Sequence, residues 1–435
     1  MGIGNIIFIA LLTTAVGLFL YNLTKVIRNI KLGGSIDRSD NPAERLKVMT
    51  RVALGQSKMV VRPVPGILHL FVYLGFIIVN IEVLDIAIDG IFGTHRFMSG
   101  FTGEFYNYLI ISFEWLALSV IFACAVFLIR RNVINLKRFW AREMTIWPRS
   151  DANIILIVEI ALMSAFLLMN ASDGVLQGRG VQPYALVGSF PVSNMLSGWL
   201  GNWETSSLIL LERSTWWFHI IGIFAFLNYL PYSKHFHIFL AFPNVYFSNL
   251  KPKTQLSNME SVTNEVKLMF DPSATPSTDL PASKFGAKDV QDLSWKNLMD
   301  SYTCTECGRC TSECPANITG KLLSPRKIVM DTRDRLEEVG KNISKQGKDY
   351  DDGKSLLGDY ITPEELWACT TCTACIQACP VNIDPLSIIV DLRRYLVMEQ
   401  SAAPAELNNM FTNIENNGAP WQFSPSDRLN WKDEA

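Results

Sequence analysis

Apolar residues are concentrated in the first half of the chain, where they form long continuous runs. Each run is about 20 residues long, which is the length that an α-helix needs to cross roughly 30 Å of hydrocarbon. The remaining sequence is polar. The pattern therefore predicts an all-α protein that begins with a bundle of five transmembrane helices. We expect these helices near residues 4–24, 66–88, 107–129, 152–171 and 210–232.

The connections between these runs differ sharply in charge. Segments 25–62 and 130–151 contain fifteen Lys and Arg residues, whereas the other two connections contain only Arg96 and Arg179. Basic connections stay on the cytoplasmic side, so this bias predicts an N-terminus outside and the chain after residue 233 inside. The pattern fits a multi-pass protein of a bacterial cytoplasmic (inner) membrane. The net charge of −2 does not suggest binding to nucleic acid.

Two cysteine motifs of the same spacing occur in the polar part. "CTECGRCTSECP" and "CTTCTACIQACP" both read C-x2-C-x2-C-x3-C-P, the run that binds [4Fe–4S] clusters. Three close thiolates bind one cluster, and the fourth thiolate reaches the other cluster. The spacing therefore predicts two clusters with exchanged fourth ligands. The expected ligand sets are Cys304, Cys307, Cys310 and Cys379 for one cluster, and Cys369, Cys372, Cys375 and Cys314 for the other.

Disulfides and zinc explain these motifs less well. Disulfides are rare in the cytoplasm, and zinc sites usually combine two separated pairs of ligands. The remaining cysteine, Cys124, lies in the third apolar run and is expected to be a small core residue. Helix-start signals at Ser324, Thr362 and Asp384, each followed by proline, predict that the cluster domain is an all-helical ferredoxin.

Three of the five histidines lie at the end of the last apolar run, in "HIIGIFAFLNYLPYSKHFH". A histidine in lipid is costly without a partner, and haem b is held by axial imidazoles. Two axial ligands share one iron, so they lie at similar depth. His69, near the inner end of the second run, matches His237 or His235 in depth. Those two lie two residues apart and point in different directions, so only one of them can face His69.

His219 lies near the outer end of the fifth run, where the second run offers no histidine at matching depth. Four roles are open for it. It could bind a second haem with an unidentified partner, line a quinone pocket, or be a satisfied polar residue. In a bent helix it could also replace His237 opposite His69. We expect one haem b, with two as the alternative, and we expect His95 to be a loop residue.

These features divide the chain into four expected regions. They are a transmembrane haem b domain at 1–245, a linker rich in Pro, Ser and Thr at 246–296, a helical two-cluster ferredoxin domain at 297–400 and a tail at 401–435. The tail contains aromatic residues and is a candidate docking segment for a partner.

The pattern His-x11-Pro-x-Ser-Lys-x2-His, from His219 to His237, resembles the last span of the membrane gamma subunit of respiratory nitrate reductase. That subunit has five spans and two b haems. The resemblance implies that His69, in "GILHLFVYLGF", corresponds to its inner-haem ligand. The expected outer-haem ligand falls on Val79 or Asn80, which cannot replace a histidine, and this departure agrees with a single haem.

A membrane domain of this kind joined to two cysteine quartets resembles the heterodisulfide-reductase-related family, which includes electron-transfer-flavoprotein:menaquinone oxidoreductase. Segments 41–59, 231–247 and 416–431 share this likeness. Longer members continue into cysteine-rich domains with a CCG motif, whereas this sequence has no cysteine after Cys379. The resemblance therefore implies a separate CCG-domain iron–sulfur subunit, an electron-transfer flavoprotein or a dehydrogenase as partner.

The sequence thus predicts a membrane-bound electron-transfer subunit of a respiratory quinone-linked oxidoreductase. Electrons would pass between a cytoplasmic partner and (mena)quinone through two [4Fe–4S] clusters and haem b. The resemblance favours quinone reduction. The alternatives are a quinol-oxidising subunit of a sulfur or heterodisulfide-type reductase, a non-catalytic membrane anchor, or a redox sensor. No catalytic residue can be named, because the substrate site is expected on a partner chain.

Overall fold

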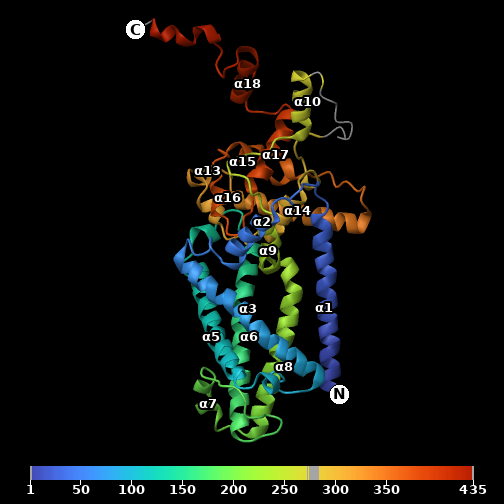
Figure 1. Ribbon diagram of the computed structural model, residues 1–435, viewed down its shortest axis with the longest axis vertical. Coiled ribbons are helices and arrows are strands. Elements are labelled where there is room, and N and C mark those ends of the chain that lie inside the picture. Colours follow the sequence, from blue (N-terminus) through green and yellow to red (C-terminus); the bar gives the residue numbers. More distant parts are fainter. Residues whose placement is uncertain (1, 272, 274–283, 434–435) are drawn as a thin grey trace.

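The computed structural model describes residues 2–271, 273 and 284–433, which form helices joined by irregular connections (Figure 1). No β-strand occurs within these ranges. Five helices are long and apolar enough to cross a membrane, so the predicted all-α class and the five spans are confirmed. They are α1 (Ile3–Ile30), α3 (Pro63–Phe92), α5 (Phe105–Asn132), α6 (Ile146–Gly178) and α8 (Thr205–Tyr229).

The bundle packs through apolar side chains and through glycines where two helices approach closely. Phe8, Phe113, Phe166 and Trp216 belong to one buried core that joins α1, α5, α6 and α8. At Gly222 of α8, an added Cβ would lie 2.5 Å from a methyl group of a leucine in α6. Small residues allow such close helix contacts in membranes, where packing rather than water exclusion holds helices together.

The cluster domain is also helical. Its main helices are α11 (Trp295–Thr303), α14 (Pro325–Gln346), α15 (Pro363–Trp367) and α17 (Pro385–Met398), and the short helices α12 (Arg309–Ser312) and α16 (Ala374–Ala378) lie within the cysteine motifs.

All three predicted helix starts of this domain are confirmed. Ser324 accepts a hydrogen bond from the backbone of Lys327, Thr362 forms a capping box with Glu365, and Asp384 accepts one from the backbone of Ser387. Each cap satisfies a backbone N–H that the first helical turn leaves free.

The cluster domain packs directly on one end of the bundle (Figure 1). Val26 of α1 and Leu230 and Phe236 near the end of α8 share a buried core with Leu298 and Leu336 of the cluster domain. Helices α2 (Pro42–Met49) and α9 (His237–Tyr246) lie against each other and complete the junction. The two domains therefore form a continuous apolar interface.

The expected linker at 246–296 extends too far toward the C-terminus. Ala287, Val290 and Leu293 are fully buried in the core of the cluster domain, because the chain there already packs against its helices. The same stretch contains helix α10 (Glu260–Phe270), while residues 272 and 274–283 lie outside the described residues. The tail helix α18 (Ala405–Asn417) extends away from the bundle (Figure 1). Its docking role stays a prediction.

A buried ion pair joins the cluster domain to the connection between α5 and α6. The guanidinium of Arg326 has no exposed surface, and its Nη2 lies 2.7 Å from Oε1 of Glu143. Arg326 also donates to the backbone oxygen of Arg138 at 2.7 Å. Buried charges require such partners, because each charge loses its hydration in the interior.

We expect Arg326→Met to lower the apparent free energy of unfolding of the cluster domain by about 3 kcal/mol, because Glu143 would stay buried without its counter-ion. Denaturant unfolding in detergent, followed by the visible absorption of the clusters, measures this. The exposed Lys341–Glu337 pair, at 3.8 Å, provides the control Lys341→Met, whose effect should stay within about 0.5 kcal/mol. Equal losses in both variants would contradict the importance of the buried pair.

Candidate electron-transfer site

The two cysteine motifs adopt the same backbone conformation. The second residue after the first cysteine has a positive φ in both, 52° at Glu306 and 55° at Thr371. The residue after the second cysteine does as well, with 70° at Gly308 and 61° at Thr373. Three of these four residues are not glycine, and such residues adopt this conformation only where their surroundings hold them in it. Both loops are therefore shaped for the same task.

Backbone N–H groups point at the cysteine sulfurs. Glu306 and Thr371 donate to the Sγ atoms of Cys304 and Cys369, each at 3.4 Å, and Ile383 donates to Sγ of Cys379 at 3.3 Å. Hydrogen bonds to cluster sulfurs are one of the ways in which a protein sets a reduction potential. The loops thus provide the hydrogen-bond donors that a buried thiolate requires.

The first three cysteines of the N-terminal motif lie beside the last cysteine of the other motif. Burial raises the pKa of the Cys310 thiol well above its ordinary value, and the neighbouring Cys307, Cys304 and Cys379 raise it further, as does Cys375. Cys304 and Cys379 also belong to one buried group of side chains.

The second motif shows the reverse arrangement. Burial raises the pKa of the Cys375 thiol, and the nearby Asp384, Cys369 and Cys314 raise it further. Cys314 and Cys369 pack in the same core. An exchange of fourth ligands requires the last cysteine of each motif to lie beside the first three cysteines of the other motif, as it does here. The assignment of ligands to each cluster stays a prediction.

The donor set suits iron–sulfur clusters. All nine cysteines are free thiols, so neither quartet is used in disulfides. Among the described residues, no three His, Cys, Asp or Glu side chains are arranged to hold one metal ion. A [4Fe–4S] cluster needs a wider arrangement, because each of its four irons binds one thiolate.

His69 of α3 and His237 of α9 face each other beneath the cluster domain. Their ring centroids are 6.5 Å apart. Two imidazoles on opposite sides of one iron, with metal–nitrogen bonds of about 2 Å, have centroids roughly 6 Å apart. Nδ1 of His237 lies 3.0 Å from the backbone oxygen of Lys234, which leaves Nε2 available, and Nδ1 of His69 is buried with no hydrogen-bond partner among the described residues.

His235 lies beside this pair, whereas His219 and His95 lie elsewhere. The ring of His235 is 5.5 Å from that of His237, at an interplanar angle of 84°. His219 is fully buried, with Nδ1 2.9 Å from the backbone oxygen of Leu162, and its Nε2 has no partner in the described part of the chain. His95 is in the connection that follows α3, with Nε2 3.4 Å from Asp173. The structure thus brings His69, His235 and His237 together, and among these His69 and His237 have the centroid spacing expected of two axial ligands of one iron.

A polar connection runs from the first cysteine motif to these histidines. The backbone N–H of Glu306 donates to Cys304, and its carboxylate forms a buried ion pair with Lys234. Burial opposes ionisation of Glu306, but Lys234 and Arg333 outweigh it and hold the pKa of that carboxyl below its usual value. The backbone oxygen of Lys234 in turn lies beside Nδ1 of His237.

The sequence patterns did not identify Glu306 as important or pair it with Lys234. The sequence around each residue could have indicated that its charge needs a partner. A charged residue next to a cysteine of a buried motif, and a lysine between two histidines at the membrane boundary, each need a nearby counter-ion. Nothing in the sequence indicates that the two residues are partners, because 71 residues separate them.

Comparison with known proteins supports the cluster domain. A family model described as a 4Fe-4S dicluster domain matches residues 303–383, which contain both quartets. The chain therefore contains a domain of this kind. No solved structure matches the chain.

The chain is also similar to larger oxidoreductases. It is 30% identical, over 99% of its length, to the probable iron-sulfur-binding oxidoreductase FadF of Bacillus subtilis, and 27% identical, over 96%, to the EtfAB:quinone oxidoreductase of Syntrophomonas wolfei. It spans only 61% and 58% of these two relatives. A shorter region, 24% of the chain, is 35% identical to one of the subunits of a ferredoxin/F(420)H(2)-dependent CoB-CoM heterodisulfide reductase of Methanosarcina acetivorans, covering 52% of that protein.

The exchanged ligands can be tested one cluster at a time. We expect Cys379→Ser to impair the cluster of the N-terminal motif and Cys314→Ser to impair that of the second motif, each losing up to roughly half of the bound iron. Iron analysis and electron paramagnetic resonance of the reduced protein distinguish the two clusters.

Cys124→Ser is the matched control, since this buried cysteine lies alone in α5, and iron content should not change. If Cys379→Ser removed instead the signal of the second motif's cluster, each motif would hold its own cluster with all four cysteines.

Proposed function

The chain is related to iron–sulfur oxidoreductases that include an EtfAB:quinone oxidoreductase and heterodisulfide reductase subunits. From this premise we propose that it transfers electrons between its cluster domain and its membrane domain. Electrons pass between a cytoplasmic partner and a quinone through two [4Fe–4S] clusters and one haem b. One observation carries this proposal: a cysteine motif and an opposed pair of histidines are joined through Glu306 and Lys234.

The cluster bound by the first motif and Cys379 lies next to the membrane domain in this proposal. Arg309, between Gly308 and Cys310, donates to the backbone oxygen of Lys58 at 2.7 Å. The ammonium of Lys58 donates to the backbone oxygen of Cys379 at 3.1 Å. Lys58 precedes α3, the helix that contains His69. These contacts support the N-terminal motif as the one that exchanges electrons with the membrane domain.

The second motif is the entry point from the partner. Cys372 is solvent-exposed, as are Thr370 and Thr371 beside it, whereas Cys304 and Cys379 are buried. An electron donor can approach a cluster most closely where one of its ligands reaches the surface. Electrons from the partner therefore reach the exposed cluster first and the membrane-proximal cluster second.

His69 and His237 would hold the haem. Bound there, haem b supplies a one-electron carrier within the apolar bundle. The protein's own contribution is orientation: the backbone oxygen of Lys234 fixes the ring of His237, and α3 places His69 opposite it. A bond from Nδ1 to a backbone oxygen selects the tautomer whose Nε2 is free to bind metal.

The relative named as an EtfAB:quinone oxidoreductase supports quinone as the other redox partner. The likeness to heterodisulfide reductase subunits supports a second candidate function, in which the chain oxidises a quinol and delivers electrons to a sulfur enzyme. In both cases the substrate chemistry outside the membrane domain belongs to a partner, such as a flavoprotein or a further iron–sulfur protein.

Electron flow can be tested in nanodiscs that contain the full chain. A reduced low-potential dye should reduce the clusters and the haem, and a soluble naphthoquinone should then reoxidise the haem. A non-catalytic anchor predicts no reoxidation. If the corresponding quinol reduces the clusters faster than the naphthoquinone oxidises the haem, the quinol-oxidising alternative is correct.

Haem content tests the ligand pair. We expect His69→Leu and His237→Leu to abolish haem binding, because each variant removes one of the two axial imidazoles. His235→Leu and His219→Leu are matched controls and should keep one haem per chain. Retention of haem in His237→Leu, or a wild-type ratio of two haems per chain, would refute this assignment.

A further inference from the structure

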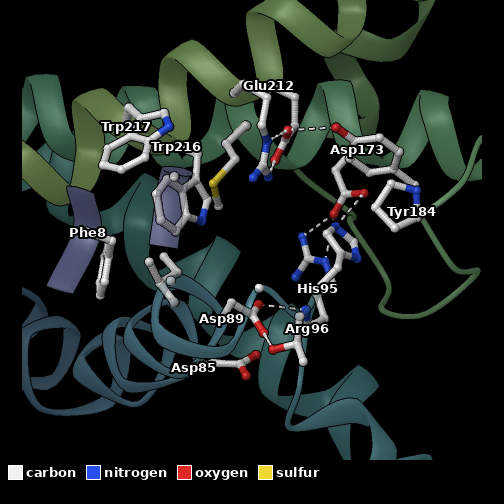
Figure 2. Close-up of a pocket in the computed structure, with 18 of the residues that line it drawn as sticks. Phe8, Asp85, Asp89, His95, Arg96, Asp173, Tyr184, Glu212, Trp216 and Trp217 are labelled. Carbon is white, nitrogen blue, oxygen red and sulfur yellow. Dashed lines mark hydrogen bonds and ion pairs between the residues drawn. The ribbon is translucent and has the colours of Figure 1, made fainter. Parts of the chain in front are cut away.

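A cavity of about 460 Å³ (Figure 2) is lined by residues near the start of α1, at the end of the bundle that lies away from the cluster domain in Figure 1. Its walls come from α1, α3, α6 and α8 and from the two outer connections. A volume of this size is typical of sites for small organic ligands. The histidine pair and the cysteine motifs do not line it, so it is a separate site.

One side of the cavity is aromatic. Phe8 of α1 and Trp216 of α8 have ring centroids 5.7 Å apart, and Trp216 and Trp217 have centroids 5.0 Å apart. Figure 2 shows these three side chains together, and the guanidinium of Arg213, which is paired with Glu212, lies 5.4 Å from the ring centroid of Trp216. Helix α1 is exposed along most of its length, so this aromatic wall is the side nearest to lipid. Such a wall suits a flat, apolar ring system.

The other side is polar and buried. Arg96 donates to Asp173 at 2.6 Å and to Asn170 at 2.9 Å, and Tyr106 donates to Asp85 at 2.9 Å. Asp85 also accepts a hydrogen bond from the backbone. These contacts satisfy both aspartates and leave the positive charge of Arg96 shared among several neighbours.

Glu82 is the exception in this network. Its side chain is 4% exposed, and its closest charged neighbour is Arg96, whose Nη1 lies 3.7 Å from Oε1. Oε2 has no hydrogen-bond partner among the residues that the structure describes. A buried oxygen without a partner is costly, and a hydrogen-bond partner within the cavity would satisfy it.

We propose that this cavity binds the head group of a quinone, with the ring against Phe8, Trp216 and Trp217 and one carbonyl oxygen accepting a hydrogen bond from the protonated carboxyl of Glu82. The inference rests on the proposed function, in which electrons reach the membrane domain. It adds the place in the bundle where the quinone is reduced. Two electrons from the partner, delivered through the clusters and haem, and two protons from water convert the two carbonyls to hydroxyls. Glu82 passes one of these protons to the carbonyl that it contacts.

The position of the cavity fits this role. Thirteen residues of α3, roughly 20 Å along the helix axis, separate His69 from Glu82. Aromatic side chains fill part of this interval. His219 follows Trp216 by about one turn of α8, and its ring centroid is 5.9 Å from that of Phe166 in α6. The opposite side of the cavity reaches the outer connections at His95 and Tyr184, close to the water that supplies protons.

The site can be located by photolabelling the full chain in nanodiscs with an azido-naphthoquinone, followed by peptide mapping. We expect labelled peptides from the outer ends of α1 and α8, and an excess of unlabelled naphthoquinone should suppress the labelling. Labels confined to other parts of the bundle would overturn the proposal, even if the protein reduces quinone.

Glu82→Gln tests the proton transfer. It should lower the rate of quinone reduction by about tenfold or more, while labelling by the azido-quinone changes by less than about threefold. Glu82→Asp should recover part of the rate. Glu159→Gln is the matched control, since Glu159 lies in α6 but does not line the cavity, and its rate should stay within about twofold of wild type.

Cluster and haem content of each variant checks that it is folded. A wild-type rate in folded Glu82→Gln overturns the role of Glu82. If Glu82→Gln does not fold, Glu82→Asp and the label map still decide the outcome. Failure of wild-type protein to transfer electrons from reduced haem to any quinone would refute the proposed function itself, whereas normal transfer with labels elsewhere would refute only the cavity.

Discussion

The buried ion pair between Glu306 and Lys234 couples the cluster domain to the membrane domain. The side chains of these residues are 3% and 9% exposed, so neither charge is hydrated well. Each needs the other, because removal of one partner leaves an uncompensated charge in a low-dielectric interior. Glu306 lies inside the loop of the first motif, and Lys234 lies three residues before His237. The pair therefore fixes the spacing between a cluster loop and a candidate haem ligand.

Other basic residues at the end of the bundle next to the cluster domain serve two purposes. Arg62, in the basic connection before α3, pairs with Glu313 of the cluster domain at 2.7 Å, and Lys58 contacts the backbone of Cys379. Basic residues in such connections also set the orientation of the spans during insertion. The charges from which the sequence predicts the orientation of the bundle thus also form the docking surface for the cluster domain.

The end of the bundle opposite the cluster domain shows how two carboxylates in similar apolar runs can differ. Glu114 of α5 is fully buried and accepts hydrogen bonds from the backbone of Val192 and Ser193 and from Asn170, so it anchors the connection before α7 (Asn194–Leu200). Glu82 of α3 keeps one oxygen without a partner among the described residues and lines a cavity. A carboxylate whose oxygens all accept hydrogen bonds has a structural role, whereas one with an unpartnered oxygen can bind a ligand.

The sequence by itself determined the features that depend on neighbouring residues. The five spans follow from runs of apolar residues, the two quartets from cysteine spacing, and the helix starts at Ser324, Thr362 and Asp384 from local caps. Only the tertiary structure decided which residues meet across the fold. It placed the ring of His237 opposite His69, paired Glu306 with Lys234 and left Glu82 unsatisfied within the described part of the chain, because each of these relations joins helices that are distant in sequence.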